Sequence, residues 1–178
     1  ELGYSRTARN STGKQLCIFI ENMAWEKPDD FGQDMIAGFR KMAEPAGFSV
    51  EIVSLDVHIQ KAMHYDEYML FNGYLGGFFL GLTFADPWMQ EFKSCHSPTV
   101  LYDNHVKANP YVTQVGIDNN EGMDLAVARL KELGHQKIGY LSSALGSYIY
   151  QARYMAFFHA LRQNGMDTSP SLAGKSYY

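Results

Sequence analysis

Short apolar runs alternate with segments of helical spacing along most of the chain, and this alternation limits the possible folds more than any other feature. Between the runs, apolar residues recur every three to four positions, which is the spacing of a helix with one buried face. Strands that alternate with helices form a parallel sheet covered on both faces. The sequence therefore predicts an α/β fold with three layers: helix, sheet and helix. The apolar runs lie at 15–20, 48–55, 76–82, 99–103, 115–117 and 137–141.

The order of these elements predicts one complete lobe followed by the start of a second. Residues 15–111 hold four strands and three helices, enough for a lobe of their own. Residues 112–178 begin a second run of the same kind, which stops before it can bury its own sheet edge. The polar opening, 1–14, is predicted to be a linker. The helices of the first lobe are expected at 31–46, 59–73 and 86–96.

The second run has the clearest helix boundaries. Asp118 and Glu121 have the spacing of a capping box at a helix start, and Gly134 stands where a left-handed residue ends a helix. A strand at 137–141 and a last helix at 148–164 should follow. The first of these helices carries an apolar stripe of Met123, Ala126, Val127, Leu130 and Leu133. The last helix carries a sheet-facing stripe of Ala156, Phe157, Ala160 and Leu161.

Composition excludes several classes of protein. Of the 178 residues 46% are hydrophobic, so the chain can bury a sizeable core. The net charge of −4 argues against nucleic-acid binding through the chain's own surface, because such domains usually carry a basic face. No segment approaches the roughly 18 apolar residues of a membrane span, and the opening lacks the apolar core of a signal peptide. Cys17 and Cys95 are expected to be buried, reduced thiols of a cytoplasmic protein.

Candidate binding residues follow the strands, because ligands of open α/β sheets bind beyond the carboxyl ends of the strands. Arg153 is the most informative, since it continues the buried stripe of the last helix toward the helix start. A guanidinium there opposes the helix dipole and needs oxygen partners. A bound polyol or carboxylate would supply them, and so would an internal ion pair with Asp103 or Asp118. The segments that follow strands are 21–31, 83–88, 103–105 and 142–153.

Three further residues in these segments have two open roles. Asp103 ends a buried strand, so its carboxylate either accepts hydrogen bonds from sugar hydroxyls or begins an Asx turn. Trp25 and Phe31 flank the loop after the first strand, where an aromatic ring can stack on the apolar face of a sugar. From position alone, core packing is favoured for Phe31, and both roles are open for Trp25.

No catalytic or metal-binding motif accompanies these residues in the sequence. The histidines lack metal-ligand spacing, the glycines at 73–81 do not form a nucleotide-binding loop, and no nucleophile elbow is present. We therefore expect no catalytic residue, no metal and no cofactor. A Rossmann-like enzyme would need a phosphate loop or an acid–base pair, and it is the least favoured alternative.

Two stretches of the second run resemble the central part of LacI/GalR-type transcriptional regulators. The first, VGIDNNEGMDLAVARLKELGHQKIGYL at 115–141, fits the family pattern V-x-x-D-N-x-x-G-x-x-x-A followed by L-x-x-x-G-H-x-x-I-x-x-L. The second, QARYMAFFHALRQNGM at 151–166, fits R-x-x-G-F-x-x-A-L-x-x-x-G, except that Ala156 replaces the usual glycine. In the first lobe, SPTVLYD resembles the family's P-V-V-x-x-D, and the opening resembles the hinge that leaves a DNA-binding headpiece.

The resemblance implies a periplasmic-binding-protein type 1-like fold with a small effector, expected to be a sugar or sugar derivative, between two lobes. It favours Arg153 and Asp103 as effector contacts, and Trp25, Phe31 and Tyr148 complete the candidate binding set. Asp118 and Asn119 match the D-N of the crossover, where a hinge or capping role is expected.

The resemblance also implies a mechanism and partners. Effector binding would shift the population of lobe arrangements in a cytoplasmic homodimer and so change operator binding by a headpiece that this chain lacks. No membrane partner is expected. The alternative on the same fold is a periplasmic sugar-binding protein of a transporter, against which the absent signal peptide and the hinge-like opening argue.

Overall fold

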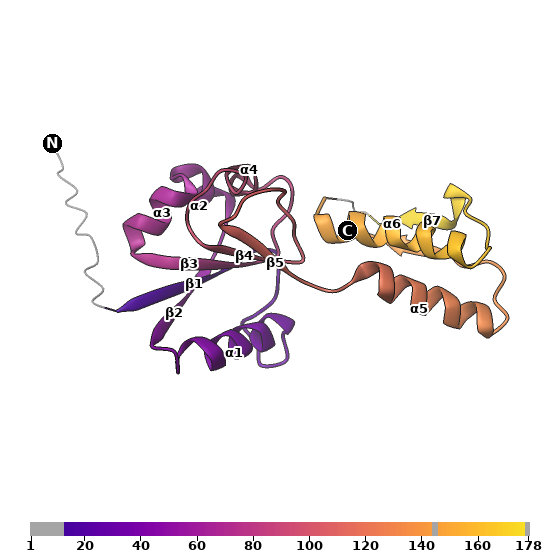
Figure 1. Cartoon of the computed structure of the whole chain (residues 1–178), viewed down its shortest axis with the longest axis horizontal. Helices are drawn as coiled ribbons and strands as arrows, with labels where there is room; N and C mark the ends of the chain where they lie inside the picture. The colour runs from indigo at the N-terminus through magenta and orange to yellow at the C-terminus, as the bar shows by residue number, and fades with distance from the viewer. Residues whose placement is uncertain (1–12, 144–145, 177–178) are drawn as a thin grey trace. The chain divides into compact units, whose positions relative to one another are not determined.

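In the computed structural model, which describes residues 13–143 and 146–176, the chain divides between Val115 and Gly116 into two units (Figure 1). Strands alternate with helices in both units, as predicted, and the predicted α/β class is confirmed. Residues 1–12 of the predicted linker lie outside the described residues, and Lys14 already belongs to the first strand.

The first unit contains a five-stranded sheet in the order β2-β1-β3-β4-β5, and all of its strand pairs are parallel. The central strand β1, Lys14–Ile20, pairs with β2, Phe48–Ser54, on one side and with β3, Tyr74–Leu80, on the other. Beyond β3 lie β4, Thr99–Tyr102, and β5, Val112–Val115. The first four strands coincide with predicted apolar runs.

The strand predicted at 115–117 is displaced. Residues Val112–Val115 form it as β5, and it joins the first sheet as a fifth strand instead of opening the second lobe. Hydrogen bonds from Thr99 N to the Tyr111 carbonyl and from Asp103 N to the Val115 carbonyl, both 2.9 Å, flank its pairing with β4. The sequence pattern does not reveal β5 at these residues, because Val-Thr-Gln-Val is not an apolar run. The strand is recognised only by its backbone pairing with β4.

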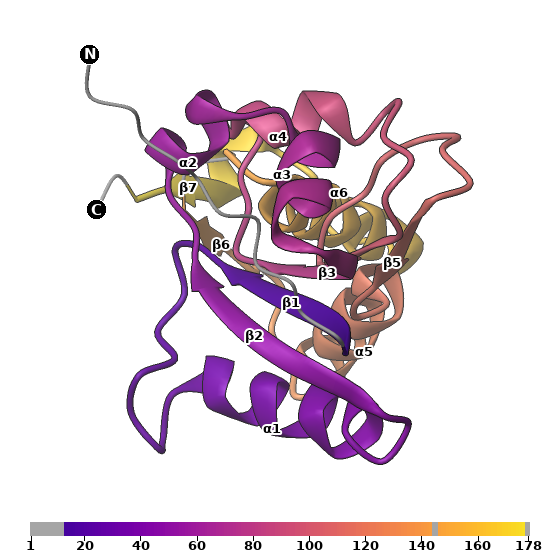
Figure 2. The same cartoon turned by 90° about the vertical axis from the view of Figure 1, so that its left-hand side faces the viewer.

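Helices cover both faces of this sheet (Figure 2). One helix, α1 at Phe31–Ala43, packs on one face, and three short helices pack on the other. Residues Cys17–Ile20 of β1 are at most 1% exposed, because neighbouring strands flank them and both helical layers cover them. The three short helices are α2, Val57–Ala62, α3, Tyr65–Asn72, and α4, Pro87–Glu91.

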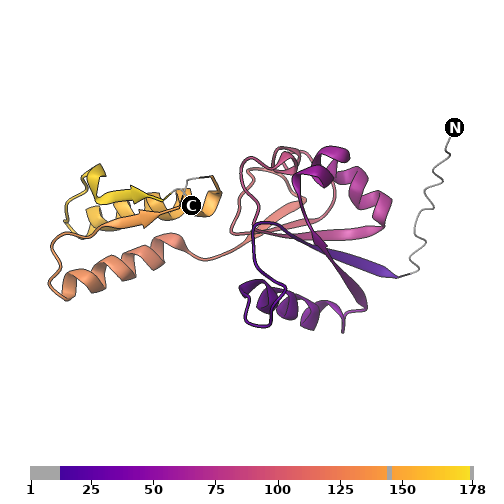
Figure 3. The same cartoon turned by 180° about the vertical axis from the view of Figure 1, so that it is seen from behind.

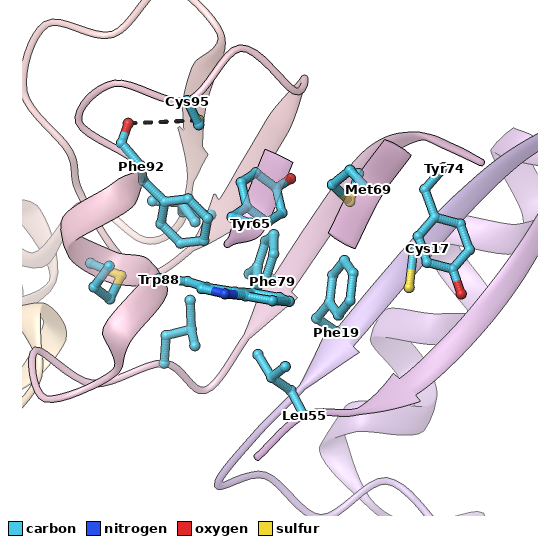
Figure 4. Close-up of a cluster of buried hydrophobic side chains, with 13 residues drawn as sticks. Cys17, Phe19, Leu55, Tyr65, Met69, Tyr74, Phe79, Trp88, Phe92 and Cys95 are labelled. Atoms are coloured by element: carbon cyan, nitrogen blue, oxygen red, sulfur yellow. Dashed lines mark hydrogen bonds between the residues drawn. The ribbon is translucent and has the colours of Figure 1, made fainter. Parts of the chain in front are cut away.

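An aromatic cluster fills the space under the short helices (Figure 4). The Phe19 ring stacks on Phe79 with centroids 4.5 Å apart and meets Trp88 edge-on at 5.7 Å. Tyr65 is fully buried, and its hydroxyl forms a 2.8 Å hydrogen bond with Thr99 Oγ1. Large aromatic rings with satisfied polar groups give this unit its main core.

The single helix predicted at 59–73 is two helices, α2 and α3, separated by an extended break at Met63 and His64. The break is stabilised from outside the segment, since Glu91 of α4 accepts a 2.7 Å hydrogen bond from Tyr65 N at the start of α3. A carboxylate at a helix start also complements the helix dipole. Local spacing cannot reveal this partner, because it lies 26 residues away.

Both cysteines, Cys17 and Cys95, are free and buried, as predicted. Burial raises the pKa of the Cys17 thiol far above its ordinary value, and Glu51 adds to this effect. Burial likewise raises the pKa of Cys95. These thiols are structural side chains and not reactive ones.

The second unit begins with α5, Asn119–Glu132, and continues with β6, Tyr140–Ser142, and α6, Tyr148–Gln163 (Figure 3). A 3-10 turn at Pro170–Leu172 precedes β7, Ala173–Lys175, which pairs parallel with β6. Helix α6 packs against both α5 and β6.

The predicted boundaries of these helices are confirmed. The Asp118 carboxylate caps α5 by accepting hydrogen bonds from Asn120 N at 3.0 Å and Glu121 N at 3.1 Å. Gly134 follows α5 in the left-handed conformation, with φ 89°. The predicted stripe of α5 is confirmed only in part, since Val127 is buried but Ala126 is exposed and Leu133 is 58% exposed. The whole predicted stripe of α6 is buried: Ala156, Phe157, Ala160 and Leu161.

Candidate functional site

The carboxyl ends of the strands bring three segments of the first unit together. Because β1, β3 and β4 are parallel, the residues that follow them meet at one edge of the sheet. Glu21 follows β1, Gly81 follows β3 and Asp103 follows β4. A 3.0 Å hydrogen bond from Glu21 N to the Leu80 carbonyl fixes the end of β1 to the end of β3. This edge carries the predicted binding residues of the first unit.

Phe31 lies at this edge with 54% of its surface exposed, so the core role favoured from the sequence is wrong. Its ring centroid is 6.1 Å from that of Tyr102 at the end of β4. The loop that follows β1, and not Phe31, covers the start of α1. It can approach the helix closely because Gly32, which is buried there, has no side chain. A Cβ on Gly32 would lie 2.7 Å from the Ala24 carbonyl oxygen. Phe31 therefore offers an exposed aromatic ring beside β4.

Trp25 is only partly buried and packs against the core beneath α1. Its carbonyl accepts a hydrogen bond from the Gln33 side-chain amide, which ties the loop to the first turn of α1. Of the two roles open for Trp25, these contacts favour core packing. The part of the ring that does not pack against the core is exposed.

Asp103 follows β4 in a left-handed conformation with φ 51°, which aspartate tolerates better than most residues. Its side chain is partly buried at the sheet edge. The next residue, Asn104, is 4% exposed and donates from Nδ2 to the Leu82 carbonyl at 2.9 Å. Among the described residues, Asn104 Oδ1 has no hydrogen-bond partner. The edge therefore combines a carboxylate with an unsatisfied amide oxygen.

A polar network at the same edge, Glu21–Gln60–Asp86, was not singled out from the sequence. Gln60 is 2% exposed, and its Nε2 donates to Glu21 Oε2 at 2.8 Å and to Asp86 Oδ1 at 3.2 Å. Gln60 Oε1 accepts from Trp88 N at 3.2 Å. Thr83 donates to Asp86 Oδ2 from its backbone N at 2.6 Å and from its hydroxyl at 3.0 Å. The strand-end rule points to the segments of Glu21 and Asp86, but no local pattern identifies Gln60.

Burial and the neighbouring charge of Asp86 raise the pKa of Glu21 from its ordinary 4.5 to about 7. This pKa also includes a raising effect of a hydrogen bond shared with Asp86 and of the Asp56 charge, and a lowering effect of the Gln60 hydrogen bond. Near neutral pH, Glu21 therefore exists partly as the protonated acid.

In the second unit, Arg153 lies partly buried on α6 and donates from Nε to Asn119 Oδ1 at 3.2 Å. Its partner is thus the amide beside Asp118, and Asp118 itself is occupied with capping α5. The internal ion pair with Asp118 that the sequence allowed does not form. A guanidinium has five N–H donors, so this hydrogen bond uses one of them. The predicted crossover residue Asn119 and the predicted effector contact Arg153 are therefore neighbours.

Two buried serine hydroxyls border the segment between β6 and α6. Ser142 ends β6 and is 5% exposed, while Ser147 precedes α6 and is 7% exposed. Among the described residues neither Oγ has a hydrogen-bond partner, and Ser147 does not use its side chain to cap α6. Tyr148, the remaining predicted contact, is the first residue of α6 and is partly buried. Buried hydroxyls are normally hydrogen-bonded, so the Ser142 and Ser147 hydroxyls are unusual among the described residues.

The described part of the chain also has cavities that none of these residues line. One, of about 660 Å³, opens at the amino edge of the first sheet, where Lys14, Leu75 and Tyr111 contribute to its lining. Another, of about 560 Å³, lies along α6 of the second unit beside Tyr154, His159 and Arg162. Within 13–143 and 146–176, no group of three or more metal-ligating side chains occurs, and none of the helices is long and apolar enough to cross a membrane.

Solved structures of transcriptional regulators share this fold. A LacI transcriptional regulator from Bacillus cereus has a TM-score of 0.75 and 17% identity over 94% of this chain and 60% of its own. The regulator CcpA of Lactococcus lactis has a TM-score of 0.72 and 16% identity over 93% of this chain and 60% of its own. A sugar-binding LacI-family regulator from Escherichia coli, solved with phosphate, has a TM-score of 0.62 and 17% identity over 92% and 58%.

Neither a protein-family model nor a curated protein sequence matches the chain. The likeness therefore lies in the structure, and the chain spans about 60% of the length of the regulators that it resembles. The chain has the α/β fold of LacI-family transcriptional regulators.

Proposed function

We propose that this chain is the effector-binding core of a LacI/GalR-type transcriptional regulator and that residues of both units bind a sugar or sugar derivative. The residues before β1 would link it to a DNA-binding headpiece, and the regulator would act as a cytoplasmic homodimer without enzymatic activity. Effector binding would favour one arrangement of the units and so change operator affinity.

The observation that carries this proposal is the pair of unsatisfied hydroxyls at the end of β6 and before the start of α6. Ser142 and Ser147 are more than nine-tenths buried, with hydroxyls that have no partner among the described residues. Arg153 lies on the next turns of the same helix, with one donor engaged by Asn119. Burying such groups without hydrogen bonds is unfavourable, and a polyol would satisfy hydroxyls and guanidinium together.

The edge of the first sheet supports the same class of ligand. Phe31 presents an exposed ring beside Tyr102, and Asp103 and Asn104 place oxygens at the neighbouring strand end. An aromatic ring flanked by acceptors suits a sugar, which has an apolar face and a rim of hydroxyl donors. The likeness to a sugar-binding regulator supports this choice.

Isothermal titration of the chain with neutral sugars and sugar phosphates tests the proposal. Arg153→Gln should weaken binding of any sugar found by about 10- to 100-fold, the loss expected for one charged hydrogen-bonding partner. Arg162→Gln is the matched control, because Arg162 lies exposed on the same helix. It should leave affinity within about twofold.

Two results would contradict the proposal. The first is no binding by any sugar of the panel. The second is equal affinity for Arg153→Gln and the unmodified chain, which would show that Arg153 serves only to tie α6 to Asn119. Thermal unfolding of both variants separates this structural role from binding, because loss of the Asn119 contact would lower stability without ligand.

A further inference from the structure

The Glu21–Gln60–Asp86 network joins two carboxyl groups through one buried amide. Gln60 Nε2 lies within 3.2 Å of an oxygen of each acid, and its own oxygen accepts from the start of α4. All polar atoms of this amide are thus engaged, so it cannot turn away from either acid. Two carboxyl groups held so close favour a state in which they share one proton.

The network lies at the root of the loop that carries Trp25. The loop begins at Glu21, and the Glu21 carbonyl oxygen lies directly against the backbone of Gly81. A Cβ on Gly81 would lie only 1.6 Å from that oxygen. Asn22 adopts a left-handed backbone with φ 52° and donates from Nδ2 to the Gly81 carbonyl at 3.3 Å. The first two residues of the loop are therefore held tightly to the end of β3. The Glu21 carboxyl group, which contacts Gln60, belongs to the first of these two residues, so its charge lies beside this attachment.

Among the described residues, the charges that act on Glu21 are those of Asp86 and Asp56. Thr83 donates twice to one Asp86 oxygen, which leaves Glu21 as the acid that takes up the proton. Asp56, which caps α2, adds negative charge on the Gln60 side. His58, also on α2, is exposed and follows Asp56 closely. Burial and these acids raise the pKa of Glu21 to about 7, so its proton is exchanged in the physiological range.

We propose that the Glu21–Gln60–Asp86 network is a proton-operated switch that fixes the 21–30 loop when protonated and loosens it when the proton leaves. One proton passes from the Glu21 carboxyl to solvent, and the repulsion between two carboxylates then weakens the attachment to β3. Because the loop leads to Phe31, effector affinity would depend on pH, and this second half rests on the proposed function.

Acrylamide quenching of tryptophan fluorescence tests the switch without a ligand. Trp25 lies partly exposed in the loop, whereas Trp88 is fully buried and largely shielded from the quencher. The quenching constant should rise at least about twofold between pH 5.5 and 8.5, as expected for a segment that loses its anchoring contacts. The midpoint should lie near pH 7.

Three variants separate Glu21 from other titrating groups. Glu21→Gln, which imitates the protonated acid, should keep the low quenching constant at every pH. Glu26→Gln removes an exposed carboxylate of the same loop, and His58→Gln removes the nearby imidazole; both should titrate as the unmodified chain does. Persistence of the transition in Glu21→Gln, or its loss in either control, would overturn the proposal.

The ligand half is tested by titrating a bound sugar in two buffers of different ionisation enthalpy near pH 7. If sugar binding is coupled to protonation of Glu21, the protein should take up protons when the sugar binds. The Glu21→Gln variant should show no such proton uptake. If no sugar binds, the proposed function fails, yet the quenching transition still decides whether the switch exists. If a sugar binds without proton uptake, the loop switch is not linked to effector binding and that half is wrong.

Discussion

Replacing Glu21 by glutamine should stabilise the first unit at alkaline pH. Glutamine keeps the shape and the Gln60 contact but removes the charge that Asp86 opposes. A pKa raised from 4.5 to about 7 corresponds to about 3 kcal/mol of unfavourable free energy for the ionised acid. Because Glu21 is only partly buried, solvent screening reduces this to about 1–2 kcal/mol.

The sign of the pH dependence follows from proton binding. The folded state of Glu21 binds its proton more tightly than the unfolded state, so its contribution to stability is fully present below pH 4.5. The contribution is lost as the pH rises toward about 7 and is absent above it. The unmodified chain should therefore lose about 1–2 kcal/mol between pH 5 and 8 that Glu21→Gln retains.

Urea unfolding followed by tryptophan fluorescence measures this difference. Both tryptophans, Trp25 and Trp88, belong to the first unit, so the signal reports on that unit alone. With a urea dependence of about 2 kcal/mol per molar, the midpoint of Glu21→Gln at pH 8.5 should exceed that of the unmodified chain by about 0.5–1 M. At pH 4.5 the two midpoints should nearly coincide.

Glu26→Gln provides the control for a change in net charge, since Glu26 is exposed in the same loop. Its midpoints should follow those of the unmodified chain at every pH. Parallel pH curves for Glu21→Gln and the unmodified chain would refute the reasoning, because they would show that Asp86 does not oppose the charge of Glu21 in solution.

Three other predictions concern the first unit. Gly81→Ala should lower the free energy of unfolding by more than about 3 kcal/mol in urea, because φ is 79° and the new Cβ would overlap the Glu21 carbonyl at 1.6 Å. Asn109→Ala should lower it by about 2–4 kcal/mol, because the buried amide of Asn109 donates two hydrogen bonds at 2.8 and 2.9 Å and accepts one from a backbone N–H. Cys17 and Cys95 should resist a thiol reagent at least about 100-fold longer in the native protein than in urea, as mass spectrometry can show, because burial raises both thiol pKa values.

The fold could be predicted from the sequence wherever side-chain pattern and backbone agree. Buried strands such as 15–20 are continuous apolar runs, and the helix after Asp118 carries its own cap and stop signals. The pattern fails where a partner outside the segment determines its structure. Strand β5 has no apolar run and is defined by pairing with β4, and the break between α2 and α3 depends on Glu91.

The candidate site was predictable only in outline. The strand-end rule selected the right segments, and the position of Arg153 on its helix anticipated its partial burial beside α5. Position alone favours core packing for Phe31, because a helical stripe does not show that a loop covers the helix start. Gln60 could not be found, because a lone glutamine becomes informative only when two acids from other segments converge on it.

The central position of β1 sets the kinetic behaviour of the first unit. Backbone amides at Cys17–Ile20 are paired into a sheet with a strand on either side and have almost no contact with water. Such protons exchange with deuterium only when the entire sheet comes apart, so their rates measure the global opening of this unit. A substitution or condition that accelerates exchange at these amides therefore increases global unfolding of the first unit. One that leaves their exchange unchanged affects only the outer elements of the unit.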